Sequence, residues 1–252
     1  MDKVLEEIAG KKAELDRLRL ATPRGLENFE HVQDIEITYT SNAIEGNTLT
    51  ASETMLVVEH GITIGGKPLK DHMEAIDHYE AIRYVRALAR RGTRLTEMDV
   101  RTLHGLVVQR SEPGIAGRYA DRGRFVLTDI GRRAFPSPAE VPGLMGDFAG
   151  WLPAALDTPA TAFTAHRRLV EIHPFNDGNG RTARLFMNLV LLRGGYPPVA
   201  VRPEDRLAYI RALQQAGAES FDLLMYERLD ATLGESLSAL RQAVPEGGSP
   251  VS

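Results

Sequence analysis

Apolar positions recur at helical spacing along most of the chain, and this spacing predicts an all-α fold. The first helix is charged throughout, with its apolar side chains roughly on one face: Leu5, Ile8, Leu15 and Leu18. Further helices are predicted over residues 26–46, 69–92, 97–109, 138–152, 159–172, 204–216 and 221–243. The stretch "LFMNLVLL" at 185–192 is apolar nearly all round, which is typical of the buried centre of a helical bundle.

Several boundaries carry recognisable capping residues. Gly92 follows a basic last turn and predicts a helix end, and Thr96 predicts the next N-cap. The stretch from Ser137 to Glu140 has the spacing of a capping box, with Pro138 as the first helical residue. Thr158 and Pro159 predict another helix start in the same way. These signals divide the helical pattern into separate elements joined by short loops.

One segment differs in kind. Residues 111–138 are rich in Gly, Pro and Arg, and "RFVLTDI" at 124–130 is the best strand candidate in the chain. We therefore expect a small β-hairpin flap at about 118–136 within an otherwise helical chain. For the domains, we predict N-terminal helices over 1–95, a catalytic core over 96–240 and a disordered tail at 245–252.

Composition narrows the functional classes. The chain has 252 residues, 43% of them hydrophobic, and a net charge of −4, which gives no general reason to expect nucleic-acid binding. The arginines of "RRGTR" and "GRR" are interpreted as solvated surface for the same reason. There is no cysteine, which excludes disulfides and thiolate chemistry. No signal peptide and no apolar stretch of about 20 residues is present, so a cytoplasmic protein without membrane contact is expected.

The candidate chemistry is concentrated in "HPFNDGNGRTAR", residues 173–184, directly before the apolar stretch. A helix that begins near Asn179 would present free N–H groups and its positive dipole end to an anion. Gly178 and Gly180 allow the backbone to approach a phosphate, while Arg181 and Arg184 can hold further phosphate oxygens. The remaining two ionisable residues have different roles: Asp177 suits Mg²⁺ and His173 suits a general base.

Each of these residues also has an ordinary structural interpretation, as a turn, a cap or a hydrogen-bonded histidine. The whole set exceeds what a turn needs, so chemistry on a nucleoside triphosphate is favoured. The segment is not a P-loop, because the spacing G-x-x-x-x-G-K-[ST] and its lysine are absent. His166 is assigned to the core or to the surroundings of the site, and the other histidines show no metal-binding spacing.

The segment 173–184 resembles the signature of the Fic (Fido-domain) family, H-x-F-x-[DE]-G-N-G-R-x-x-R, at every fixed position. The resemblance covers about residues 30–230 and implies a Fic-type helical bundle that transfers AMP from ATP to a Ser, Thr or Tyr hydroxyl of a target protein. It implies that His173 takes the hydroxyl proton and that Asp177 holds Mg²⁺ (or Mn²⁺). It also implies that Asn179 and the loop amides form an anion hole, with Arg181 and Arg184 on the outer phosphates.

The resemblance extends to the expected hairpin, which is similar to the flap on which Fic targets dock by strand addition. The matching positions, which are also expected to touch the nucleotide, are Val126, Leu127, Thr128 and Asp129. Tyr209 matches the family's tyrosine on the adenine side of the nucleotide site, and Ile210 lies beside it in the sequence. Gly217 stands where some relatives carry asparagine, which leaves the preference for ATP over other nucleotides open. An ordinary surface hairpin is the alternative.

A second motif lies upstream in "SNAIEG", residues 41–46, which resembles the family's inhibitory pattern [ST]-x-x-x-E-[GN]. Ser41 and Glu45 are one helical turn apart, and the resemblance implies that Glu45 pairs with Arg184 and blocks the γ-phosphate position. The sequence thus predicts an autoinhibited adenylyltransferase. Two alternatives are removal of AMP with Glu45 orienting a water, and a catalytically idle nucleotide-binding interaction module. A homodimer is possible by resemblance.

Overall fold

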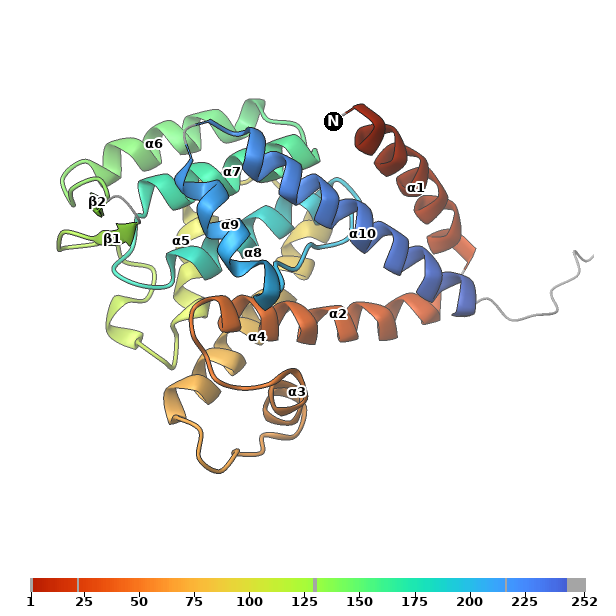
Figure 1. Ribbon diagram of the computed structural model, residues 1–252, viewed down its shortest axis with the longest axis horizontal. Coiled ribbons are helices and arrows are strands. Elements are labelled where there is room, and N and C mark those ends of the chain that lie inside the picture. The colour runs from red at the N-terminus through yellow and green to blue at the C-terminus, as the bar shows by residue number, and fades with distance from the viewer. Residues whose placement is uncertain (1, 22, 129–130, 216, 244–252) are drawn as a thin grey trace, which may run out of the picture.

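Ten α-helices and one β-hairpin form the part of the chain that the computed structural model describes, residues 2–21, 23–128, 131–215 and 217–243 (Figure 1). The helices are α1 (Asp2–Ala21), α2 (Pro23–Ile44), α3 (Ala51–His60), α4 (Leu69–Arg91), α5 (Glu97–Val107), α6 (Val141–Trp151), α7 (Pro159–Ile172), α8 (Asn179–Arg193), α9 (Arg206–Gln214) and α10 (Glu219–Ala243). Short 3-10 turns lie at Pro113–Ile115, Leu152–Ala154 and Pro203–Asp205. The prediction of an all-α fold with one hairpin is confirmed.

The apolar helix α8 is the centre of the bundle, as predicted. Every residue from Arg181 to Leu191 is buried, and α7, α4 and α5 pack around it. Asn188 satisfies its amide in this apolar setting by donating to the carbonyl of Val199, 3.1 Å away, and accepting from the N–H of the same residue at 2.8 Å. The buried helix fixes the position of its own N-terminus, where the signature residues lie.

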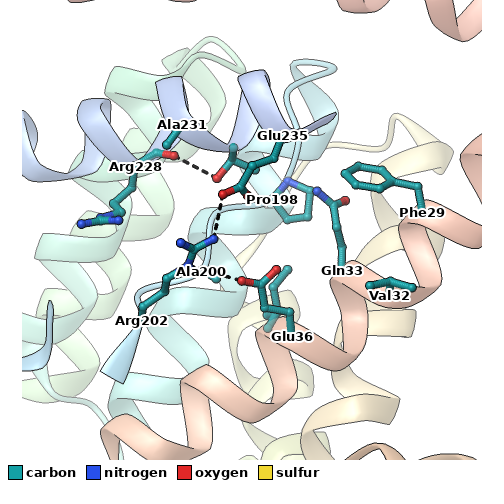
Figure 2. Close-up of a pocket in the computed structure, with 12 residues that line it drawn as sticks. Phe29, Val32, Gln33, Glu36, Pro198, Ala200, Arg202, Arg228, Ala231 and Glu235 are labelled. Carbon is teal, nitrogen blue, oxygen red and sulfur yellow. Dashed lines mark hydrogen bonds and ion pairs between the residues drawn. The ribbon is translucent and has the colours of Figure 1, made fainter. Parts of the chain in front are cut away.

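The N-terminal helices pack onto this core. Figure 1 shows α1 alongside α10, where Ile8 and Leu15 are buried. Arg202 links α2 to α10, because its guanidinium lies 3.5 Å from Glu36 and 2.8 Å from Glu235 beside a cavity of about 60 Å³ (Figure 2). Anchored in this way, α2 carries its C-terminal end to the signature loop.

The observed helices differ from the predicted ones in two places. The helix α6 begins at Val141 rather than at Pro138, because Ser137 and Glu140 close a separate turn in which the serine N–H and hydroxyl both donate to Glu140. Helix α3 was not predicted at all, although it has a capping box in which Thr50 and Glu53 bond reciprocally. The predicted tail at 245–252 lies outside the described residues.

The flap is an antiparallel pair, β1 (Phe125–Thr128) and β2 (Gly131–Ala134). Val126 pairs with Arg133, and both side chains line the same pocket. Phe125 lies on the opposite face, where the Arg132 guanidinium stands 3.6 Å from its ring centre. The hairpin therefore presents one face to the pocket and the other away from it.

Candidate active site

His173 ends α7 and begins the loop that leads into α8. It adopts a left-handed conformation (φ 50°, ψ 58°), the one such non-glycine residue among those described. Its ring stacks on Phe135 with 3.7 Å between ring centres. Burial lowers the pKa of His173 to about 4, so the imidazole is neutral at pH 7 and can accept a proton.

The loop after His173 is held by contacts within the bundle. The Asn179 side chain accepts from the N–H of Phe175 at 2.9 Å and donates to its carbonyl at 2.8 Å. The Asn179 amide therefore fixes the conformation of the loop, a contact that its predicted place in an anion hole did not include. Gly178 takes the expected left-handed conformation at φ 73°.

His104 is a site residue that the sequence reasoning missed. Its Nδ1 accepts from the N–H of Gly117 at 3.0 Å, which leaves Nε2 to donate to the carbonyl of Asp177 at 3.1 Å. The ring also stacks on Phe175 with centres 3.7 Å apart. One neutral histidine thereby connects the start of the flap segment to the signature loop.

The predicted contact between Glu45 and Arg184 is present. The guanidinium of Arg184 donates from Nη2 to Glu45 Oε1 at 2.6 Å, while its Nε donates to the hydroxyl of Ser41 at 3.0 Å. The Glu45 carboxylate lies against Gly180, where a Cβ would collide with it. Glu45 thus stands at the N-terminal end of α8, in the space that an anion bound there would take.

The two partners of this ion pair differ in burial. The Arg184 side chain is 5% exposed, whereas that of Glu45 is 38% exposed and lies in the turn directly after α2. A half-exposed carboxylate is still solvated, so its desolvation cost is smaller than that of a fully buried pair. Glu45 can therefore be removed or displaced without unfolding the site.

Arg181 is buried beside two carboxylates. Its side chain is 3% exposed and lies 3.1 Å from Glu74 of α4 and 3.7 Å from Asp177. Asp177 accepts from the N–H of Gly178 at 2.6 Å. Burial raises the pKa of Asp177, but Arg181, this hydrogen bond and Lys70 outweigh burial, so the net pKa is lowered and the carboxylate is ionised.

A cavity of about 290 Å³ opens beside His173. It is lined by the predicted residues Val126, Arg184, Tyr209 and Ile210, together with Glu45 and Gly180. The hydroxyl of Tyr209 lies between His166 Nε2 at 2.8 Å and Arg184 Nη1 at 3.4 Å. Leu127 and Thr128 lie in β1, and Asp129 lies outside the described residues.

Four buried imidazoles make stability depend on pH. Burial lowers the pKa of His78 and His166 to about 3, and of His104 and His173 to about 4. Because these values are below those of the unfolded chain, unfolding in acid takes up protons. The free energy of unfolding should therefore fall as the pH drops from 6.5 towards 4, by up to about 1.4 kcal/mol per pH unit for each histidine, and be unaffected by them above pH 7.

Urea unfolding between pH 4.5 and 7.5 measures this slope. His166→Gln should show a shallower slope than the wild type, because one proton fewer is taken up. His60→Gln is the matched control, since His60 is exposed at the end of α3. Equal slopes for the wild type and His166→Gln would contradict the assignment of acid sensitivity to this histidine.

The surroundings of Asp177 fit a divalent cation that takes a single protein ligand. No group of three or more His, Cys, Asp or Glu side chains among the described residues could hold a metal ion. Mg²⁺ commonly uses one or two protein carboxylates and completes its shell with substrate phosphates and water. The ionised, 45% exposed Asp177 meets that requirement as a single protein ligand.

The fold and the site together define a helical domain whose innermost helix begins directly after the loop that carries His173 and Asp177. The model of the Fic/DOC family matches residues 94–191, which contain this loop. The structure is similar to that of a Fic domain containing signaling protein from Bacteroides thetaiotaomicron, with 31% identity and a TM-score of 0.87 over 96% of this chain and 100% of that one. The chain belongs to the Fic/DOC family.

Other relatives agree with this assignment. A fragment of Fic-1 from C. elegans has 30% identity and a TM-score of 0.82 over 94% of this chain and 71% of its own. A protein adenylyltransferase Fic from Nematostella vectensis is 39% identical over 75% of this chain and 43% of its own length. Caenorhabditis elegans protein adenylyltransferase fic-1 is 36% identical over 71% and 35%. The chain thus spans less than half the length of these curated relatives.

Among the described residues, no helix has both the length and the apolar character needed to cross a lipid bilayer.

Proposed function

We propose that this protein is an autoinhibited protein adenylyltransferase. The observation that carries the proposal is the arrangement of His173 and Arg184 around one 290 Å³ cavity, with Glu45 bound to Arg184 inside it. The names of the relatives, protein adenylyltransferases, support the same activity. ATP is the proposed nucleotide, and a target protein docking on the flap is the proposed acceptor.

In the proposed reaction, neutral His173 accepts the proton of a Ser, Thr or Tyr hydroxyl of the target. The hydroxyl oxygen forms a bond to the α-phosphorus of ATP, and the bond from that phosphorus to the bridging oxygen breaks to release pyrophosphate. The N–H groups at the start of α8 stabilise the charge that develops on the α-phosphate oxygens. The left-handed conformation of His173 and its stacking on Phe135 fix the ring for this step.

Asp177 is the residue proposed to hold Mg²⁺ or Mn²⁺, and the cation would neutralise phosphate charge. Arg184 is proposed to hold the terminal phosphate when Glu45 does not occupy it, and Arg181 an outer phosphate oxygen. The flap residues Val126 to Asp129 are proposed to register the target segment. Two expectations from the sequence remain predictions. They are the division into a catalytic core over 96–240 preceded by regulatory helices, and a cytoplasmic location.

The position of the label on ATP tests the activity. Protein incubated with ATP labelled at the α-phosphate should become labelled, whereas ATP labelled at the γ-phosphate should leave no label on protein. Retention of γ-label instead would contradict AMP transfer. The reverse reaction is tested with a substrate that already carries AMP. Release of AMP by the wild type, but not by a Glu45 variant, would favour it, because the half-exposed Glu45 could then orient the attacking water. No labelling by any variant would favour a nucleotide-binding module.

A further inference from the structure

Glu74 of α4 lies between the signature helix and the turn that carries Glu45. Its Oε1 is 3.1 Å from Arg181 Nη1, and its Oε2 accepts from the Asn47 side chain at 3.1 Å. Its backbone carbonyl accepts from the Asn42 side chain at 3.3 Å. The Glu74 side chain is only 10% exposed, so these contacts compete little with water.

Both asparagines flank Glu45 in the sequence. Asn42 lies three residues before it and Asn47 two residues after it, and both are fixed to α4. Asn47 also donates to the carbonyl of Asp71 at 3.0 Å. The backbone on both sides of Glu45 is therefore held by α4. A change at α4 is transmitted to Glu45 through two short connections.

Arg181 is an incompletely paired guanidinium. Its Nε and Nη1 are buried and make no hydrogen bond, since Glu74 is close enough to Nη1 for an ion pair but is not aligned to accept from it. Buried guanidinium N–H groups without acceptors are costly, and an anion that supplies acceptors would stabilise them. Glu74 is the negative group with which such an anion would have to compete.

We propose that Glu74 is a positioning residue that couples nucleotide binding to the seating of Glu45, an inference that rests on the proposed function. One carboxylate holds both Arg181 of the signature helix and Asn47 of the inhibitory turn. When a phosphate group binds Arg181, the attraction between Arg181 and Glu74 becomes weaker. Glu74 then holds Asn47, and with it the turn that carries Glu45, less firmly. By reciprocity, a firmly seated Glu45 weakens nucleotide binding.

Glu74→Gln tests the coupling, because glutamine keeps the size of the side chain and can still accept from Asn47 but carries no charge opposite Arg181. The affinity for ATP, measured by calorimetry, should increase roughly 3- to 10-fold, and self-labelling with α-labelled ATP should rise roughly 5-fold, within the usual range of coupling between two sites. The control is Glu80→Gln on the same helix, where Glu80 pairs with Arg110 on the surface. This control should leave both measurements at the wild-type level.

The background Glu45→Gly separates regulation from catalysis. If Glu74 acts through Glu45, Glu74→Gln should add no labelling in that background, so the two substitutions are non-additive. A loss of labelling in the double variant would overturn the proposal, because Glu74 would then serve transfer itself. Wild-type affinity and labelling in Glu74→Gln would overturn it as well.

Two further measurements keep the result interpretable. If thermal unfolding shows that Glu74→Gln does not fold, Asn47→Ala is the alternative variant, because it removes the hydrogen bond between Asn47 and Glu74. Asn47→Ala should also raise labelling. Labelling at the wild-type level would contradict the coupling. If Glu45→Gly shows no labelling at all, the proposed function fails, and calorimetry still decides the coupling. The gain in ATP affinity caused by Glu74→Gln should be smaller in the Glu45→Gly background than in the wild type, and equal gains would overturn the coupling.

Discussion

Replacement of Glu45 by glycine is expected to raise self-labelling and target labelling by AMP roughly 10- to 100-fold, the effect of a coupling free energy of about 1–3 kcal/mol. The carboxylate is bound to the guanidinium of Arg184 at 2.6 Å and lies against Gly180. Its removal frees both the guanidinium and the adjacent space at the start of α8. A triphosphate can then place its α-phosphorus in line with the hydroxyl that attacks it.

The stability of the protein should hardly change in this variant. Because Glu45 is 38% exposed, the loss of its ion pair is expected to lower the free energy of unfolding by less than about 1 kcal/mol. Arg184 keeps two acceptors, the hydroxyl and the carbonyl of Ser41. A thermal unfolding curve therefore serves as the control that the higher labelling does not come from partial unfolding.

Glu45→Gln provides a graded comparison. Glutamine fills the same space and lacks the charge, so labelling between that of the wild type and that of Glu45→Gly is expected. If Glu45→Gln equals the wild type, occupation of the space is the main inhibitory effect; if it equals Glu45→Gly, the charge is. Equal labelling by the wild type and Glu45→Gly would end the case for autoinhibition.

The helical architecture could be predicted from the sequence because most helices are long and have strong signals at their ends. Gly92 and Thr158 are observed at the caps where they were predicted. The burial of α8 followed from its lack of a polar face. Helix α3 was missed because its large apolar residues, 55–58, form one continuous run and do not recur at helical spacing. Its capping residues, Thr50 and Glu53, were nevertheless a usable signal.

The site could be predicted only as far as its residues are local or matched to a motif. The contact between Glu45 and Arg184 spans 139 positions and was inferred by resemblance, not by periodicity. The partners of Arg181 and Asn179 could not be inferred, because the side-chain direction at a helix start depends on what packs against it. His104 gave no signal, since its two hydrogen bonds join backbone groups 13 and 73 residues away.

Replacement of His173 by alanine is expected to lower AMP transfer roughly 100- to 10,000-fold, the usual contribution of a general base. The measurement belongs in the Glu45→Gly background, where the starting rate is high enough for such a loss to be quantified. Because His173 is the one histidine among the described residues that line the 290 Å³ cavity, no imidazole of that lining can take over the proton. The affinity for ATP should stay within a few-fold of that of Glu45→Gly, since the phosphates are held by Arg184 and the loop amides.

The backbone at His173 requires a second variant. Alanine in a left-handed conformation is strained by about 1–2 kcal/mol, so His173→Ala could shift the loop as well as remove the base. Asparagine tolerates this conformation better and has no basic nitrogen. His173→Asn should therefore show the same loss of transfer with a smaller loss of stability. Transfer by His173→Asn at the rate of Glu45→Gly would mean that proton removal does not limit the reaction, and a base other than His173 would have to be sought.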